Sequence, residues 1–94
     1  MPRLVGMEGP YTGQVFLLTN TTNIIGREPD KDIVLSADTT TSRNHARIVN
    51  EGGDFVVYDN GSANGTFVNS LRISMQVLAP GDIVQFGASK FRFE

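Results

Sequence analysis

Hydrophobic residues occur along the chain in short runs that are separated by polar segments rich in glycine, proline and asparagine. In the run 45–49, Ala46 and Ile48 fall on one face and His45 and Arg47 on the other, an alternation typical of a half-buried strand. No stretch shows a sustained helical period. The pattern predicts about eleven short strands, over residues 3–7, 14–18, 23–27, 32–35, 45–49, 55–59, 66–68, 71–73, 76–78, 82–86 and 90–93.

Turn signals separate these runs roughly every 8–12 residues. The segment 50–54 contains Gly52-Gly53 and has the chemistry of a tight hairpin, and Asn69-Ser70 marks another short turn. The densest turn signal is the polar segment 60–65. Short strands at this spacing are typical of β-sandwiches and barrels, so we expect an all-β fold.

Length and composition limit the organisation of the chain. With 94 residues, of which 39% are hydrophobic, we expect a single domain over residues 1–94 with one core. The sequence stops directly after its last predicted strand, which fits a domain taken from a longer protein. The absence of cysteine and the presence of one histidine exclude disulfides, thiolate metal sites and multi-histidine clusters. We therefore expect no metal site and no cofactor.

Charge and hydropathy exclude two further classes of function. Eight Lys and Arg against ten Asp and Glu give a formal net charge of −2 without any basic block, which argues against nucleic-acid binding. The apolar runs are far shorter than the roughly 20 residues of a membrane helix, and the N-terminal residues lack the basic and long apolar pattern of a signal peptide. We expect a monomeric, cytoplasmic protein that does not insert into membranes.

Three polar clusters lie at predicted strand ends: Gly26-Arg27, Ser42-Arg43-Asn44-His45, and the segment 60–66 with Asn64-Gly65. In order and spacing they resemble the signature of the forkhead-associated (FHA) domain, which has a Gly-Arg, then Ser-x-x-His, then Asn-Gly in a Ser-x-Asn-Gly-Thr setting. Each motif alone is weak evidence, but the ordered set is specific and covers nearly the whole chain. The resemblance implies a two-sheet, eleven-stranded sandwich whose loops at one end bind a phosphothreonine peptide.

The resemblance also implies roles for individual residues. Arg27 and Ser42 would hold the phosphate, and Arg43 falls where the family places a further peptide or phosphate contact. Asn64 would bind the peptide backbone beside the phosphothreonine.

Three further positions are expected to support the site without touching the ligand. These are Gly26, His45 and Gly65, which would keep the binding loops in shape. A lone histidine beside a strand is in any case more often a hydrogen-bonded structural residue than a ligand or a base.

The chemistry of the residues agrees with these roles. A phosphothreonine carries about −1.5 to −2 charge and three acceptor oxygens, and the forked guanidinium of Arg27 can bind such a group through two parallel hydrogen bonds. An extended peptide needs partners for its own amide groups, and the amide of Asn64 can both donate and accept. Ala63 departs from the pattern, since many members of the family have a threonine there; we expect Arg43 to offset the missing hydroxyl.

Several polar residues of these loops have simpler interpretations. We expect Asn60 to be only a turn former, and the threonines of the run 39–41, which follows Asp38, to be solvated loop residues. For Thr41 and Asn44 the sequence leaves open whether they contact the ligand at its rim or face solvent.

Two other functions remain to be weighed. The same sandwich could serve as a phosphate-independent interaction or oligomerisation module, because a fold does not fix a function. Ser42, His45 and Asp59 could be proposed as a hydrolase triad, but no Gly-x-Ser-x-Gly elbow or oxyanion hole is indicated. The sequence therefore predicts a non-enzymatic module that recruits phosphothreonine-containing partners in signalling.

Overall fold

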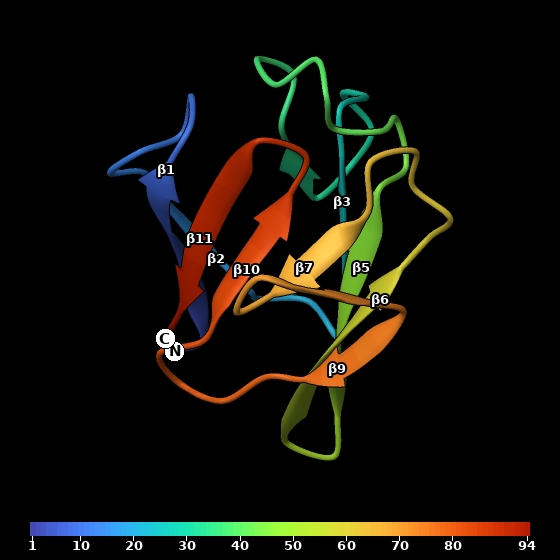
Figure 1. The fold of residues 1–94 in the computed structure, drawn as a ribbon. Coiled ribbons are helices and arrows are strands. Elements are labelled where there is room, and N and C mark those ends of the chain that lie inside the picture. The colour runs from blue at the N-terminus through green and yellow to red at the C-terminus, as the bar shows by residue number, and fades with distance from the viewer.

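The computed structural model describes residues 1–94 and consists of strands, turns and loops, without a helix (Figure 1). Eleven strands form two sheets that pack face to face, so the predicted two-sheet, all-β sandwich is confirmed. The strands are β1 (Arg3–Glu8), β2 (Val15–Leu17), β3 (Thr22–Gly26), β4 (Ile33–Val34), β5 (Ala46–Glu51), β6 (Asp54–Asp59), β7 (Thr66–Val68), β8 (Leu71–Ile73), β9 (Met75–Val77), β10 (Ile83–Phe86) and β11 (Ser89–Phe93).

The two sheets differ in size and order. One has six strands in the order β2-β1-β11-β10-β7-β8, and the other has five in the order β4-β3-β5-β6-β9. All neighbouring strands are antiparallel except the short pair β3–β4. Strands β8 and β9 are consecutive in the chain but belong to different sheets, so both sheets end on the same side of the sandwich.

The core follows from the alternation seen in the sequence. Along β11, Phe91 and Phe93 are buried and the alternate residues Lys90 and Arg92 are half-buried. On β10, Val84 and Phe86 are fully buried. Their partners across the sandwich include Ile48 on β5. Each such side chain contributes roughly 1.5–3 kcal/mol by leaving water, so the inward-facing positions fix the register of both sheets.

Two tight hairpins confirm the turn predictions. Gly52 and Gly53 have φ angles of 64° and 99°, and Asn69 and Ser70 have φ angles of 50° and 69°. Two consecutive residues with positive φ form the hairpin turn whose twist matches that of paired strands. Gly and Asn adopt these angles at low cost.

Most predicted strands differ from the observed ones by a residue or two at their ends, and β4 and β9 illustrate why. Residues 32–35 were expected to be extended, but β4 contains only Ile33–Val34. Asp32 instead closes the loop that precedes β4, because its carboxylate accepts the backbone N–H of Ile24 (2.8 Å). The strand expected over residues 76–78 is Met75–Val77, since Leu78 turns inward and is buried.

The sandwich has two distinct ends (Figure 1). The termini meet at one of them, where Arg3 and Glu94 exchange two backbone hydrogen bonds of 3.0 Å. At the opposite end lie the β3–β4, β4–β5, β6–β7 and β10–β11 connections, which together we call the loop end. All the residues that the sequence analysis assigned to ligand binding lie in three of these connections.

Candidate binding site

Strand β3 brings Gly26 and Arg27 to the loop end. A β-carbon built on Gly26 would lie 2.0 Å from the carbonyl oxygen of Arg43, so only glycine allows the two backbones to pack this closely. Backbone hydrogen bonds run from Arg27 N to Ser42 O (3.1 Å) and from Leu35 N to Gly26 O (2.8 Å). Gly26 thus lets the β4–β5 loop lie directly against the end of β3.

The half-buried Arg27 side chain points along this contact. Its Nε donates to the carbonyl oxygen of Thr41 (3.1 Å), and it pairs with no carboxylate. This single bond fixes the plane of the guanidinium and leaves both terminal nitrogens free. A fork held in this way can bind an oxyanion with little further loss of side-chain freedom.

Ser42 connects the β4–β5 loop to the β6–β7 loop. Its Oγ accepts the backbone N–H of Ala63 (3.0 Å), which leaves its hydroxyl proton available to a ligand. Ala63 itself is exposed and offers no side-chain donor at this point.

His45 joins the same two loops from inside the protein. It is fully buried; its Nδ1 accepts the N–H of Ser42 (3.0 Å) and its Nε2 donates to Gly65 O (2.9 Å). These two contacts require the neutral ring with the proton on Nε2. Burial lowers the pKa of His45, although the bond to Gly65 and the charges of Asp59 and Asp38 act in the opposite direction.

The β6–β7 loop presents Asn64 at its tip. The exposed Asn64 donates from Nδ2 to Thr40 O (2.7 Å), so its Oδ1 remains free to accept a hydrogen bond. Gly65 follows with a φ of 91°, and its N–H donates to the hydroxyl of Ser62 (3.0 Å). The positive φ explains the need for glycine here.

Asp59 shapes this loop from its base. Its carboxylate accepts the N–H groups of Gly61 and Ser62 (both 3.1 Å) and the hydroxyls of Ser62 (2.5 Å) and Thr66 (2.8 Å). Burial acts to raise the pKa of Asp59, but these hydrogen bonds outweigh it and the pKa is lowered. The carboxylate is therefore committed to the turn.

The contacts of His45 also bear on the triad Ser42, His45 and Asp59. His45 accepts from the backbone of Ser42 and not from its hydroxyl, and its second nitrogen donates to Gly65. Asp59 binds its own turn. The three side chains consequently do not form the base-to-nucleophile relay that a triad requires.

One expectation about the β4–β5 loop was wrong. Thr41 was expected to lie in solvent or at the ligand rim, but only 1% of its surface is exposed. Asp38, to which the sequence assigned no role, is also buried, with 4% of its surface exposed. The Asp38 carboxylate accepts Thr40 N (2.9 Å), Thr40 Oγ1 (2.5 Å), Ala88 N (3.0 Å) and Ser89 Oγ (2.6 Å). The bonds to Ala88 and Ser89 connect the loop to the β10–β11 turn. They are strong because hydrogen bonds to an ionised carboxylate are stronger than neutral ones.

Asp38 thereby holds the two residues whose carbonyl groups accept hydrogen bonds from Asn64 and Arg27. Thr40 O binds Asn64, and Thr41 O binds Arg27. Burial acts to raise the pKa of Asp38, but the bonds from Ser89, Thr40 and Ala88 lower it to about 2. The sequence offered one sign of this role, the Asp-x-Thr spacing of 38–40, which is typical of a side chain that binds the backbone two residues on.

Asn60 was expected to be only a turn former, and this was also wrong. Its Nδ2 donates to Asn44 Oδ1 (2.8 Å) and its Oδ1 accepts from Arg47, whose guanidinium lies 4.4 Å from the centre of the Tyr58 ring. Asn60 and Asn44 therefore link the β4–β5 and β6–β7 loops at their outer edge.

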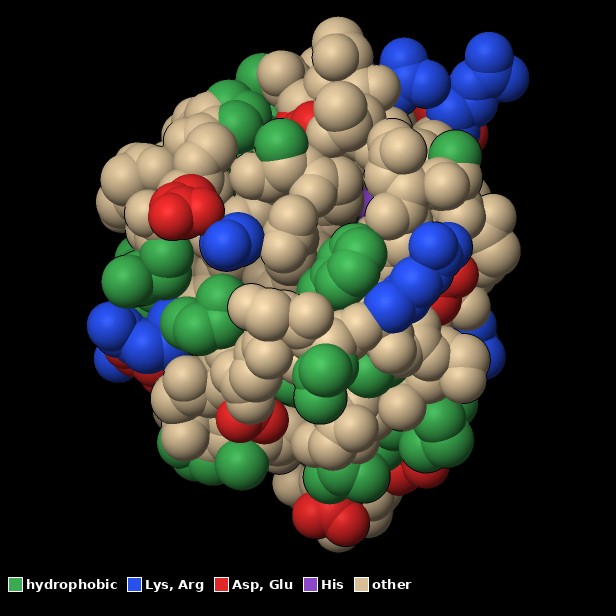
Figure 2. All heavy atoms as spheres, viewed as in Figure 1, with side chains coloured by type: hydrophobic (Ala, Val, Ile, Leu, Met, Phe, Trp, Pro, Cys, Tyr) green, Lys and Arg blue, Asp and Glu red, His purple; other side chains and the backbone are tan.

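The loop end carries unneutralised positive charge. Arg43 is exposed and forms no ion pair, and the nearby acids Glu28 and Asp30 lie 3.7 and 3.0 Å from Lys31. In Figure 2, Lys and Arg side chains project from this end of the molecule. The combination of Arg27, Arg43 and the Ser42 hydroxyl provides donors for a doubly charged oxyanion.

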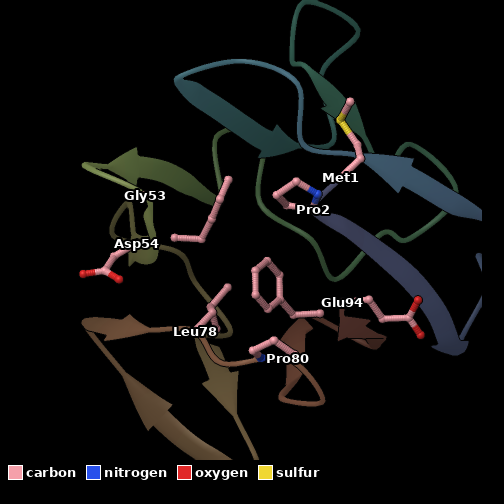
Figure 3. A pocket seen from close by; sticks show the side chains of 9 residues that line it. Met1, Pro2, Gly53, Asp54, Leu78, Pro80 and Glu94 are labelled. Atoms are coloured by element: carbon pink, nitrogen blue, oxygen red, sulfur yellow. The ribbon is translucent and has the colours of Figure 1, made fainter.

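The site is a set of loop tips and not a cavity. Two surface hollows exist, and neither is lined by a residue that the sequence analysis assigned to binding. Figure 3 shows one of them, between Met1, Pro2, Leu78, Pro80 and Glu94 at the end where the termini meet. The chain also contains no helix long and apolar enough to cross a membrane.

The chain matches known proteins over most of its length. The family model described as the FHA domain matches residues 23–87. The glycogen accumulation regulator GarA of Mycolicibacterium smegmatis is 52% identical over 89 residues, which cover 95% of this chain and 54% of that protein. The oxoglutarate dehydrogenase inhibitor of Corynebacterium diphtheriae is 47% identical over 89 residues, 95% of this chain and 60% of that protein.

Solved structures give the same result. Mycobacterium tuberculosis EmbR in complex with a low-affinity phosphopeptide superimposes with a TM-score of 0.91 and 34% identity, covering 99% of this chain and 24% of that one. The FhaA FHA domain complexed with the intracellular domain of Rv3910 superimposes with a TM-score of 0.89 and 33% identity over the full length of both chains.

Proposed function

The chain belongs to the FHA family, and from this premise we propose that residues 1–94 form a phosphothreonine-dependent module that recruits phosphorylated proteins. Arg27, Ser42, Arg43 and Asn64 bind the ligand in this proposal, and Gly26, His45 and Gly65 hold the site in shape. The chain spans 54% and 60% of the two relatives described above, so we propose that it acts as one domain of a longer protein.

The observation that carries this proposal is the double contact of the buried His45. It binds the N–H of Ser42 through one ring nitrogen and the carbonyl of Gly65 through the other, at 3.0 and 2.9 Å. The phosphate-binding serine and the peptide-binding asparagine are thereby set at one distance before any ligand arrives. Such preorganisation lowers the entropic cost of binding.

Each group assigned to the ligand has an unused hydrogen-bond donor or acceptor that suits its role. The terminal nitrogens of Arg27 donate to two phosphate oxygens, and the hydroxyl proton of Ser42 donates to a third. Asn64 already donates to Thr40, so its Oδ1 accepts a backbone N–H of the peptide. Arg43 supplies the charge that offsets the hydroxyl missing at Ala63.

The names of the relatives indicate regulation and inhibition, not catalysis. We propose that this chain has no enzymatic activity and acts as a monomer. Its partners are phosphothreonine-containing proteins and not nucleic acids. A regulator built on this module would respond to a kinase through the partner that the kinase phosphorylates.

The test is a binding titration with fluorescent peptide pools that carry a central phosphothreonine, phosphoserine or unmodified threonine. We expect binding of the phosphothreonine pool alone to be measurable by anisotropy. Arg27→Ala should weaken it about 10- to 100-fold, the equivalent of one charge-assisted contact. Arg27→Lys should weaken it nearly as much, because lysine keeps the charge but lacks the fork.

Arg3→Ala is the matched control, since Arg3 lies at the end where the termini meet and pairs with Glu94 at 2.9 Å. It should bind like the wild type. Equal binding of phosphorylated and unmodified pools would instead favour a phosphate-independent module and overturn the proposal. Phosphothreonine binding that survives both Arg27→Ala and Ser42→Ala would place the site elsewhere.

A further inference from the structure

Arg72, on the edge strand β8, lies against the turn that carries Asn64. A β-carbon built on Gly65 would lie 2.9 Å from Arg72 Nε and 3.1 Å from its Cζ. The ring of Phe67, the cross-strand neighbour of Arg72, would lie 3.2 Å from the same point. The guanidinium of Arg72 therefore lies over the backbone of Gly65.

Arg72 has no partner within the protein. Six of the eight Lys and Arg residues form an ion pair or a side-chain hydrogen bond: Arg3, Arg27, Lys31, Arg47, Lys90 and Arg92. The two that form neither are Arg43, in the β4–β5 loop, and Arg72, which lies against the β6–β7 loop. The acid at the base of this loop, Asp59, is already bound by four donors.

The spacing suits a second contact on the same peptide. Ser42 Oγ lies 3.0 Å from Ala63 N, and residues 63 and 65 are separated by at most about 7 Å of extended backbone. The Arg72 guanidinium thus lies on the order of 10 Å from the Ser42 hydroxyl, which an extended peptide spans in about three residues.

We propose that Arg72 recognises an anionic side chain of the bound peptide, two to four residues from the phosphothreonine, on the flank that crosses the Asn64-Gly65 turn. The ligand chemistry is a carboxylate or a second phosphate. This inference rests on the proposed function and adds a preference for acidic or doubly phosphorylated sequences to it.

The experiment uses one phosphothreonine peptide that binds the wild type, with neutral residues at the four positions on each side. Glutamate, and separately phosphoserine, is placed at each position in turn. The affinities are measured for the wild type, Arg72→Gln, Arg72→Glu and the control Arg3→Gln, which removes one charge at the opposite end. Urea denaturation of each variant establishes that the fold is kept.

We expect glutamate to tighten binding roughly two- to fivefold at one or two positions on one flank, as for an exposed ion pair, and phosphoserine to tighten it more. Arg72→Gln should abolish the gain while the parent peptide still binds. Arg72→Glu should turn the gain into a loss and favour lysine at the same position. Arg3→Gln should leave the profile unchanged.

Three outcomes would overturn the inference. In the first, glutamate and phosphoserine give no gain in affinity at any position of the peptide. In the second, the gain in affinity persists in Arg72→Gln. In the third, the gain disappears equally in Arg3→Gln. In each of them the parent phosphothreonine peptide still binds, so the proposed function stands. Failure of the wild type to bind any phosphothreonine peptide would overturn both.

Discussion

The substitution Asp38→Asn isolates the charge of the one carboxylate that holds the β4–β5 loop. Asparagine keeps the size of the side chain and one acceptor oxygen, but it cannot accept all four of the hydrogen bonds that Asp38 accepts from Thr40, Ala88 and Ser89. The pKa of Asp38 is lowered from 3.8 to about 2. A difference of this size corresponds to about 2.5 kcal/mol of stability held by the ionised form.

The stabilisation by Asp38 depends on pH. Because the pKa is lower in the folded protein, the stabilisation is fully present above pH 3.8, the ordinary pKa, and is lost as the pH falls toward about 2. Asp38→Asn should therefore lower the free energy of unfolding by about 2 kcal/mol at pH 7. Near pH 2 the variant and the wild type should approach each other, since about half of the Asp38 side chains in the folded wild type and nearly all in its unfolded state are then protonated.

The assay is urea denaturation at a series of pH values between 2 and 7. Asp54→Asn is the matched control, because Asp54 is exposed and its side chain forms no hydrogen bond, so this variant should follow the wild type. A loss that is equally large at pH 2 and pH 7 would refute the reasoning, as would a loss below about 0.5 kcal/mol at pH 7. At pH 7 the variant should also bind phosphothreonine peptide more weakly, because Thr40 and Thr41 position Asn64 and Arg27.

Three further predictions concern the frame of the site. Burial lowers the pKa of His45 below 6.5, so the free energy of unfolding of the ligand-free protein should fall as the pH drops below about 6.5; urea denaturation should show this slope in the wild type and not in His45→Gln. Gly26→Ala should lower the free energy of unfolding in urea by about 3 kcal/mol or more, since the new methyl group meets Arg43 O. Gly61→Ala is the control, because Gly61 has a positive φ but open space around it, and it should cost only about 1–2 kcal/mol. Equal losses would contradict the close packing at Gly26. Ser42→Ala should weaken phosphothreonine binding at least as much as it destabilises the fold, because it removes both a ligand donor and the acceptor of Ala63 N; unchanged affinity in a titration would exclude Ser42 from the site.

The strands were predictable because their signals are local. Gly52-Gly53 and Asn69-Ser70 set two hairpins by their own backbone preferences, and the alternation along β5 identified its buried face without knowledge of the partner strands. The shift at β9 arose where no such signal exists, since all three of its residues are exposed on an edge strand.

The loop interior was less predictable because its contacts are distant in sequence. Asp38 accepts a hydrogen bond from Ser89, which follows it by 51 positions, and Thr41 donates one to the carbonyl of Phe86, 45 positions away. No signal near residues 38–41 predicts this contact with the β10–β11 hairpin. The position of Arg72 beside Gly65 was not predictable for a related reason, because it depends on the pairing of β7 with β8 and on the φ of a glycine.

The central claim is that a phosphothreonine peptide binds at the loop end, between Arg27, Ser42 and Asn64. An NMR titration of the ¹⁵N-labelled protein with matched phosphothreonine and unmodified peptides tests it most directly. We predict that only the phosphorylated peptide shifts the Nε–H of Arg27, the backbone amides of Ser42 and Arg43 and those of residues 63–65. Shifts of equal size with both peptides, or shifts centred on Asp54 and Leu78 at the opposite end, would contradict the account.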